Sequence, residues 1–157
     1  MATKADFNAE EWSSIVEAPL LAGMRVVGAG RGGTIRESLA IGKVYAEARK
    51  AQGDSGLLDE LVASPPAVDP EKLKGAGDIA TVSGERLRAA IDLVTEKGSG
   101  EDAEDYRAFV LKVAQTAAEA HKEGGFVGIG GKPISEEEQS ALDEIGQVVN
   151  ASGSPGA

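Results

Sequence analysis

The sequence predicts an all-α domain, a compact bundle of six or seven helices with little or no sheet. Three observations carry this prediction. Apolar residues recur at spacings of three and four through most of the chain, which is the period of a helix buried along one face. Several of these stretches begin with a residue suited to cap a helix. Glycine- or proline-rich segments separate them.

The first helix has a complete start signal. Asn8 is suited to cap it, and Glu11 follows three residues later as the second member of a capping box. Phe7 and Trp12 occupy the two positions of a hydrophobic staple. We expect these two rings to be the structural anchor of the chain, with Trp12 largely buried against a later helix. The alternative is an exposed tryptophan on a loosely attached helix.

Proline and glycine set the remaining boundaries. Pro19 is expected to end the first helix and to open the next one at its first position. Ser83 is expected to cap a later helix. The helices after the first are expected over residues 19–27, 34–50, 55–63, 83–97, 101–123 and 135–150. Residues 1–150 are thus predicted to form a single helical domain, with a flexible tail at 151–157.

Composition excludes several classes of function. The 157 residues include 26 Asp and Glu against 16 Lys and Arg, a formal net charge of −10, which argues against nucleic-acid binding. The chain has no cysteine, so disulfides, thiolate nucleophiles and zinc sites with cysteine ligands are excluded. No apolar run reaches the roughly 18 residues of a membrane helix, and no signal peptide is recognisable, so a cytoplasmic protein is expected. The high alanine and glycine content is consistent with a bacterial source.

A glycine-rich break at residues 28–33 has the spacing of a dinucleotide-binding loop, G-x-G-x-x-G. Such a loop requires a strand before it and a second strand after the following helix. No second apolar strand follows, and residues 24–27 fit the helical spacing that begins at Leu20. A turn between two helices is therefore the preferred interpretation, and no cofactor is expected.

Carboxylate clusters supply the candidate ligands for a divalent cation. These ligands are Glu101, Asp102, Asp105, Glu136 and Glu137. The clusters lack the ligand order of an EF-hand, and both fall at predicted helix N-termini, where the helix dipole favours acidic residues without a metal. The single histidine, His121, cannot form a usual zinc site alone, so a surface role is expected. No catalytic constellation is present, so an enzyme is not expected.

The glycine-rich segment 124–133 carries three large apolar side chains, Phe126, Val127 and Ile129. Large apolar side chains on a loop are typical of docking elements. The alternative is that these three residues fill the core. The leading hypothesis is a non-enzymatic, acidic helical module that binds another protein or a second copy of itself.

Residues 22–37 and 117–145 share a layout. In each, a helix runs into a pair of glycines and is followed by a helix start of the form Thr/Ser-x-x-Glu. The repeat suggests two pseudo-symmetric helical hairpins, although capped helices after glycine loops are common enough to produce it by chance. The layout resembles TerB-like all-helical domains associated with tellurite resistance. Residues 123–145 also resemble the C-terminal part of small uncharacterised bacterial helical proteins.

The resemblance to TerB-like domains covers a minority of the chain and implies an alternative function, the binding of a small ligand or a divalent metal. It assigns no metal ligand, because this chain lacks the Asp residues that TerB-like loops carry. The positions where those Asp residues are replaced are Arg31, Gly32, Gly130 and Gly131.

Overall fold

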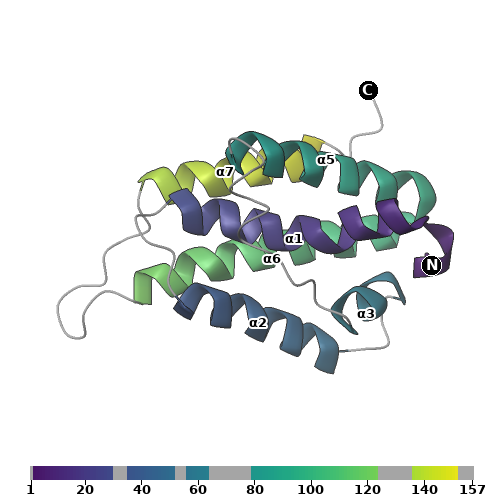
Figure 1. Cartoon of the computed structure of the whole chain (residues 1–157), viewed down its shortest axis with the longest axis horizontal. Helices are drawn as coiled ribbons and strands as arrows, with labels where there is room; N and C mark the ends of the chain where they lie inside the picture. Colours follow the sequence, from purple (N-terminus) through teal and green to yellow (C-terminus); the bar gives the residue numbers. More distant parts are fainter. Residues whose placement is uncertain (1, 30–34, 52–55, 64–78, 124–135, 152–157) are drawn as a thin grey trace.

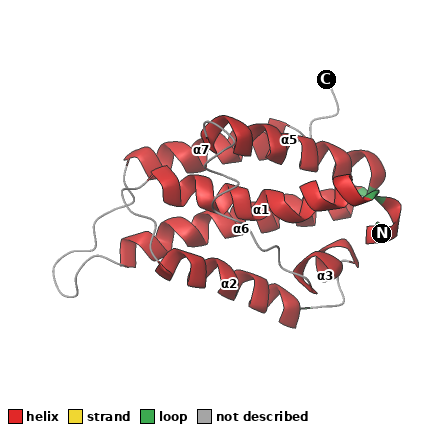
Figure 2. Cartoon of the chain, viewed as in Figure 1, coloured by secondary structure: helices red, strands yellow, loops and turns green. Residues whose placement is uncertain are grey.

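The computed structural model describes residues 2–29, 35–51, 56–63, 79–123 and 136–151. These residues form six α-helices and one short 3₁₀ helix (Figure 1), with no strand among them (Figure 2). The elements are η1 (Lys4–Asp6), α1 (Ala9–Ala29), α2 (Ile35–Lys50), α3 (Gly56–Ala63), α5 (Ile79–Lys97), α6 (Gly100–Glu123) and α7 (Glu136–Ala151). The all-α class predicted from the sequence is confirmed.

Helix α1 is the central element of the bundle (Figure 1). Helices α5 and α7 lie on one side of it, α2 and α3 lie on the other, and α6 runs behind it. The most extensive contacts are those of α1 with α6 and with α5, followed by those of α2 with α6. The pairs α1–α2 and α6–α7 follow the order expected of two hairpins, but α1 contacts α2 only slightly and packs mainly on α6.

Small residues on α1 allow its neighbours to approach closely. Ala18 and Ala22 are fully buried in the core. At Gly23, an added Cβ would lie 2.9 Å from Cδ1 of Ile41 and 3.1 Å from Cγ1 of Val113. Helices α1, α2 and α6 therefore meet at a point where the sequence provides no side chain. The core is rich in alanine, as the composition predicts.

Helix α1 continues through Pro19, so the prediction that the proline ends the first helix is wrong. Proline has no N–H group, which leaves the carbonyl of Ile15, four residues earlier, without its helical donor. The hydroxyl of Tyr106, fully buried on α6, donates a hydrogen bond to this oxygen at 2.8 Å. A bond from a neighbouring helix replaces the missing bond within α1, and one long helix forms where two were expected.

The start of α1 has the predicted capping box. The amide of Glu11 donates to Oδ1 of Asn8 at 2.9 Å, and the amide of Asn8 donates to Oε2 of Glu11 at 2.8 Å. Nζ of Lys97, at the end of α5, lies 2.7 Å from Oε2 of Glu11. The hydrogen bond from Lys97 and the one from the Asn8 amide lower the pKa of the Glu11 carboxyl. The cap thus also joins α1 to α5.

The predicted staple is also present, with the ring centroids of Phe7 and Trp12 6.2 Å apart. Phe7 is buried, and Trp12 packs against the core. Trp12 is not fully buried, but its exposure is intermediate and it packs against the core, which agrees with the expectation of a largely buried ring. It lies in the first turn of α1, at the end of the bundle, where fewer elements surround a side chain.

Helix α5 begins at Ile79, so Ser83 is not its cap. The residues from Ile79 to Val82 contain no glycine or proline, and the helix includes them, with Ser83 buried in its second turn. Helix α7 extends to Ala151, and the rest of the tail expected at 151–157 lies outside the described residues. Within the described ranges, no helix has both the length and the apolar character needed to cross a membrane.

Candidate functional site

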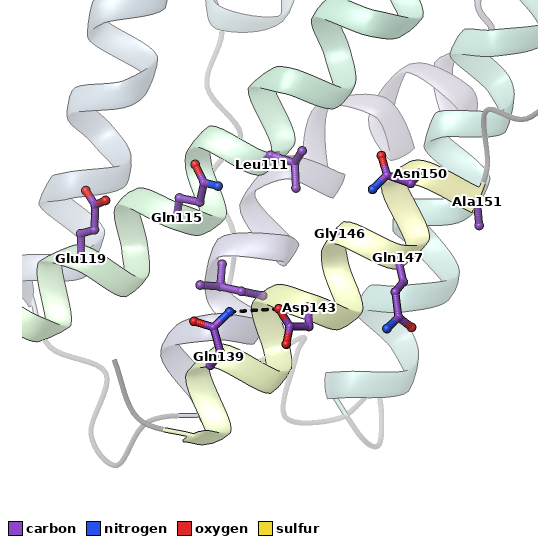
Figure 3. A pocket seen from close by; sticks show the side chains of 10 residues that line it. Leu111, Gln115, Glu119, Gln139, Asp143, Gly146, Gln147, Asn150 and Ala151 are labelled. Carbon is purple, nitrogen blue, oxygen red and sulfur yellow. Dashed lines mark hydrogen bonds between the residues drawn. The ribbon is translucent and has the colours of Figure 1, made fainter. Parts of the chain in front are cut away.

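An open groove with a volume of about 990 Å³ runs between α6 and α7 (Figure 3). Helix α6 contributes Leu111, Gln115 and Glu119, which are spaced four residues apart and therefore share one face. Helix α7 contributes a run of residues from Gln139 to Ala151. These are Gln139, Leu142, Asp143, Gly146, Gln147, Asn150 and Ala151, spaced so that they too share one face.

The lining of this α6–α7 groove combines carboxamides, carboxylates and aliphatic carbon. Four side chains are carboxamides, and Glu119 and Asp143 are carboxylates. Leu111 and Leu142 are partly buried and supply the apolar part. Nε2 of Gln139 donates a hydrogen bond to Oδ1 of Asp143 at 2.9 Å, as Figure 3 shows.

Among the described residues that line the groove, none is a lysine, an arginine or a histidine. The six carboxamide and carboxylate side chains are all exposed. The carboxamides can donate and accept hydrogen bonds, and the carboxylates can accept them, without first losing buried partners. Serine and threonine are also missing from the lining. The groove therefore has the chemistry of a surface that binds a polar or positively charged partner.

Asp102, a predicted metal ligand, has a structural role. It is 3% exposed, and its Oδ2 accepts hydrogen bonds from the amide and the hydroxyl of Ser99, both at 2.9 Å, and from the amide of Ala2 at 2.7 Å. Its own amide donates to Oγ of Ser99 at 3.1 Å, which completes a capping box at the start of α6. Burial raises the pKa of Asp102, but these hydrogen bonds outweigh it and the net pKa is lowered.

The other predicted metal ligands do not converge. Glu101 and Asp105 lie in the first turns of α6, whereas Glu136 and Glu137 lie in the first turn of α7, at the opposite end of the bundle (Figure 1). In the described part of the chain, no group of three or more His, Asp or Glu side chains is placed to hold a metal ion. Their positions match those that the helix dipole favours for acidic residues.

Other predicted features fall outside the described residues. Phe126, Val127 and Ile129 lie there, and so does the side chain of His121, whose backbone belongs to α6. A dinucleotide-binding loop needs a strand before it, and residues 24–27 form part of α1 instead, so this interpretation of the motif is excluded. Helix α1 continues to Ala29 and so includes Gly28, the first glycine of the motif.

The groove residues were missed by the sequence analysis, although the sequence holds a signal for them. Gln139, Asp143 and Gln147 recur every four residues on α7, as Gln115 and Glu119 do on α6. A polar run at helical spacing is also what any solvated helix face shows. Only the packing of α7 beside α6 turns these two faces into the walls of one groove.

Comparisons of the chain with protein-family models, with curated proteins and with solved structures gave no match. The resemblance to TerB-like domains therefore stays a prediction, neither supported nor opposed by these comparisons. The function has to be inferred from the surface of the chain itself.

Proposed function

We propose that the chain is a non-enzymatic interaction module whose α6–α7 groove binds a basic amphipathic helix of a partner protein. The observation that carries this proposal is the lining of the groove. The described residues of this lining combine four carboxamides and two carboxylates with two leucines, and none of them is cationic. A partner helix with lysine or arginine beside leucine-type residues complements each of these groups.

The shape of the groove supports a helix as the occupant. Two helices form its walls, and their lining residues repeat every three or four positions along each wall. A helix laid between them would present anchors at the same spacing, as helix-in-groove recognition requires. The volume of about 990 Å³ is at the upper end of small-molecule pockets and suits several side chains from one face of a helix.

Charge favours a basic partner over a second copy of the chain. The formal net charge of −10 attracts a basic segment and repels an identical molecule. Self-association through the groove is therefore the less favoured arrangement. The chain has no cysteine, so its folding needs no oxidising compartment, and the proposed location is the cytoplasm. Phe126, Val127 and Ile129 remain proposed as a second contact with the partner.

The alternative function, a small-ligand or divalent-metal site of the TerB-like kind, has less support for the metal. Asp102 is occupied by its hydrogen bonds to Ser99 and Ala2. The remaining acidic candidates are divided between the two ends of the bundle. A calcium titration followed by NMR tests this alternative, and shifts confined to residues 101–105 or 136–138 would revive it.

Calorimetric titration with a model amphipathic peptide of leucine and lysine tests the proposed function. Gly146 lines the groove, and a Cβ added there meets no atom within 4 Å, so Gly146→Phe can fill the groove without disturbing its walls. Gly42→Phe, at an equally open helical position outside the groove, is the matched control. We expect Gly146→Phe to weaken peptide binding at least about tenfold and Gly42→Phe to leave it unchanged. Equal binding by both variants would contradict the proposal.

A further inference from the structure

A second hollow lies on another side of α7, between α1, α5 and α7. Its volume is about 350 Å³, within the range of sites for small molecules and well below that of the α6–α7 groove. Gln147 and Ala151 line both hollows, so α7 forms a wall that the two share.

The buried lining of this α1–α5–α7 pocket is mainly apolar, and it also includes the buried Ser83. Ala22 from α1, Leu87 from α5 and Ile145 from α7 line it, and all three are buried. Val148 adds a partly buried aliphatic side chain. An apolar molecule, or the apolar part of a larger one, would replace water at these surfaces.

Two arginines also line the pocket. Arg88 is exposed, and among the arginines whose side chains the structure describes it is the one that makes no hydrogen bond or ion pair. Acidic residues outnumber basic ones by 26 to 16 in this chain, so an arginine left without an acidic partner is unusual. The guanidinium group of Arg88 is available to an anion from solution.

Arg25 already holds an anionic group. Its Nη2 lies 3.0 Å from Oε2 of Glu144, which also lines the pocket. The Arg25 side chain is 20% exposed, whereas the Glu144 side chain is 60% exposed. Glu144 is therefore mostly solvated already, and a carboxylate arriving from solution can take its place on the more buried arginine.

We propose that the α1–α5–α7 pocket binds a small organic acid with an apolar body. The carboxylate pairs with Arg25 and Arg88, and the apolar body lies against Leu87, Ile145 and Val148. Arginine suits this role because its planar group presents paired donors to a carboxylate. The apolar lining distinguishes such a ligand from a simple inorganic anion, which has nothing to place against it. The proposed ligand does not depend on the function proposed for the α6–α7 groove, although the two hollows share Gln147 and Ala151.

Octanoate is the probe, and two-dimensional NMR of the ¹⁵N-labelled full chain is the measurement. We expect saturating shifts at pocket residues such as Leu87, Arg88 and Val148. Octanol, which has the same chain and no charge, and inorganic phosphate, which has charge and no chain, are each expected to bind at least about tenfold more weakly. Phosphate binding as tightly as octanoate would overturn the apolar part of the proposal, and octanol binding equally well would overturn the ionic part.

Gly84 provides the blocking variant, because it lines the pocket and an added Cβ there meets no atom within 4 Å. We expect Gly84→Phe to abolish the octanoate shifts, Arg88→Gln to weaken binding about tenfold, and Gly42→Phe to leave it unchanged. Unchanged melting temperatures show that the variants are folded. Octanoate binding that survives Gly84→Phe, or the absence of any saturable shift in the natural chain, would overturn the proposal.

Discussion

Two buried tyrosines on neighbouring helices differ in one hydrogen bond. The hydroxyl of Tyr106 donates to the carbonyl of Ile15 at 2.8 Å, whereas the buried hydroxyl of Tyr45 has no hydrogen-bond partner among the described residues. The Tyr45 ring packs edge-on against Phe109, with the ring centroids 5.1 Å apart. Burial raises the pKa of both hydroxyls, so each stays protonated at neutral pH. The hydroxyl of Tyr106 is therefore expected to stabilise the fold, and the hydroxyl of Tyr45 to destabilise it.

Replacing each tyrosine with phenylalanine tests this expectation. Tyr106→Phe leaves the Ile15 carbonyl buried without a donor, which should lower the free energy of unfolding by about 1–3 kcal/mol. Tyr45→Phe removes a polar group that has no partner, which should raise it by up to about 1 kcal/mol. Urea denaturation of the two variants measures both values, and a change of the same sign in both would contradict the assignment.

Asp102 makes stability depend on pH. Its pKa is lowered in the folded chain, so its contribution is present above the ordinary carboxyl pKa of about 4 and is lost as the pH falls through the folded value. Asp102→Asn should lower the free energy of unfolding by about 1–2 kcal/mol at pH 7, because an uncharged amide oxygen accepts these hydrogen bonds more weakly than a carboxylate oxygen does. The difference in free energy of unfolding between the natural chain and Asp102→Asn should become smaller below pH 4, where protonation also neutralises the natural side chain. Urea denaturation at pH 7 and pH 3 checks this, and a constant difference would contradict it.

At the scale of the element, local signals predicted most of the helices. The Asn8–Glu11 box marks the start of α1, and the boundary expected between the helices at 83–97 and 101–123 agrees with the end of α5 at Lys97 and the start of α6 at Gly100. The continuation of α1 through Pro19 could not be predicted, because the hydrogen bond that compensates for the proline comes from Tyr106, about ninety residues later. Sequence patterns along one helix carry no information on a donor supplied by another. The α6–α7 groove could not be predicted for the same reason, because it forms only where two helices pack together. Each of its walls taken alone is an ordinary polar helix face.

Gly23 is the residue that fixes how closely α1, α2 and α6 approach. Gly23→Ala would gain helix propensity, but its Cβ would meet Ile41 and Val113 at 2.9 and 3.1 Å. We expect the overpacking to dominate and to lower the free energy of unfolding by about 1–3 kcal/mol. Gly42→Ala, on the open face of α2, should instead raise it by about 0.5–1 kcal/mol. Thermal melts of the pair measure both effects, and a stabilised Gly23→Ala would contradict the close packing.

Trp12 anchors the N-terminal end of α1. Its partial burial lowers the expected cost of Trp12→Ala from the roughly 3–5 kcal/mol of a fully buried ring to about 2 kcal/mol. The variant should therefore still fold at 25 °C. Chemical denaturation followed by circular dichroism checks the cost, and a fully unfolded variant would show that the ring contributes more than its burial indicates.

At the scale of the whole molecule, the all-α class could be predicted from the sequence. The positions of the two hollows proposed as binding sites could not. Helix α7 packs on α1, α5 and α6, which gives it two separate hollows, one acidic and amide-rich and one apolar with arginines. Its hydrophobic spacing indicates a helix with one buried stripe. The tertiary arrangement alone decides which polar residues beside that stripe face a neighbouring helix.

We expect a basic helix to bind in the α6–α7 groove and not over the acidic surface in general. Two-dimensional NMR of the ¹⁵N-labelled chain, titrated with the leucine–lysine peptide, tests it most directly. We expect saturable shifts at Leu111, Gln115, Leu142 and Gly146 that disappear in Gly146→Phe and persist in Gly84→Phe. Shifts spread over all the acidic helix faces, unchanged by Gly146→Phe, would contradict it.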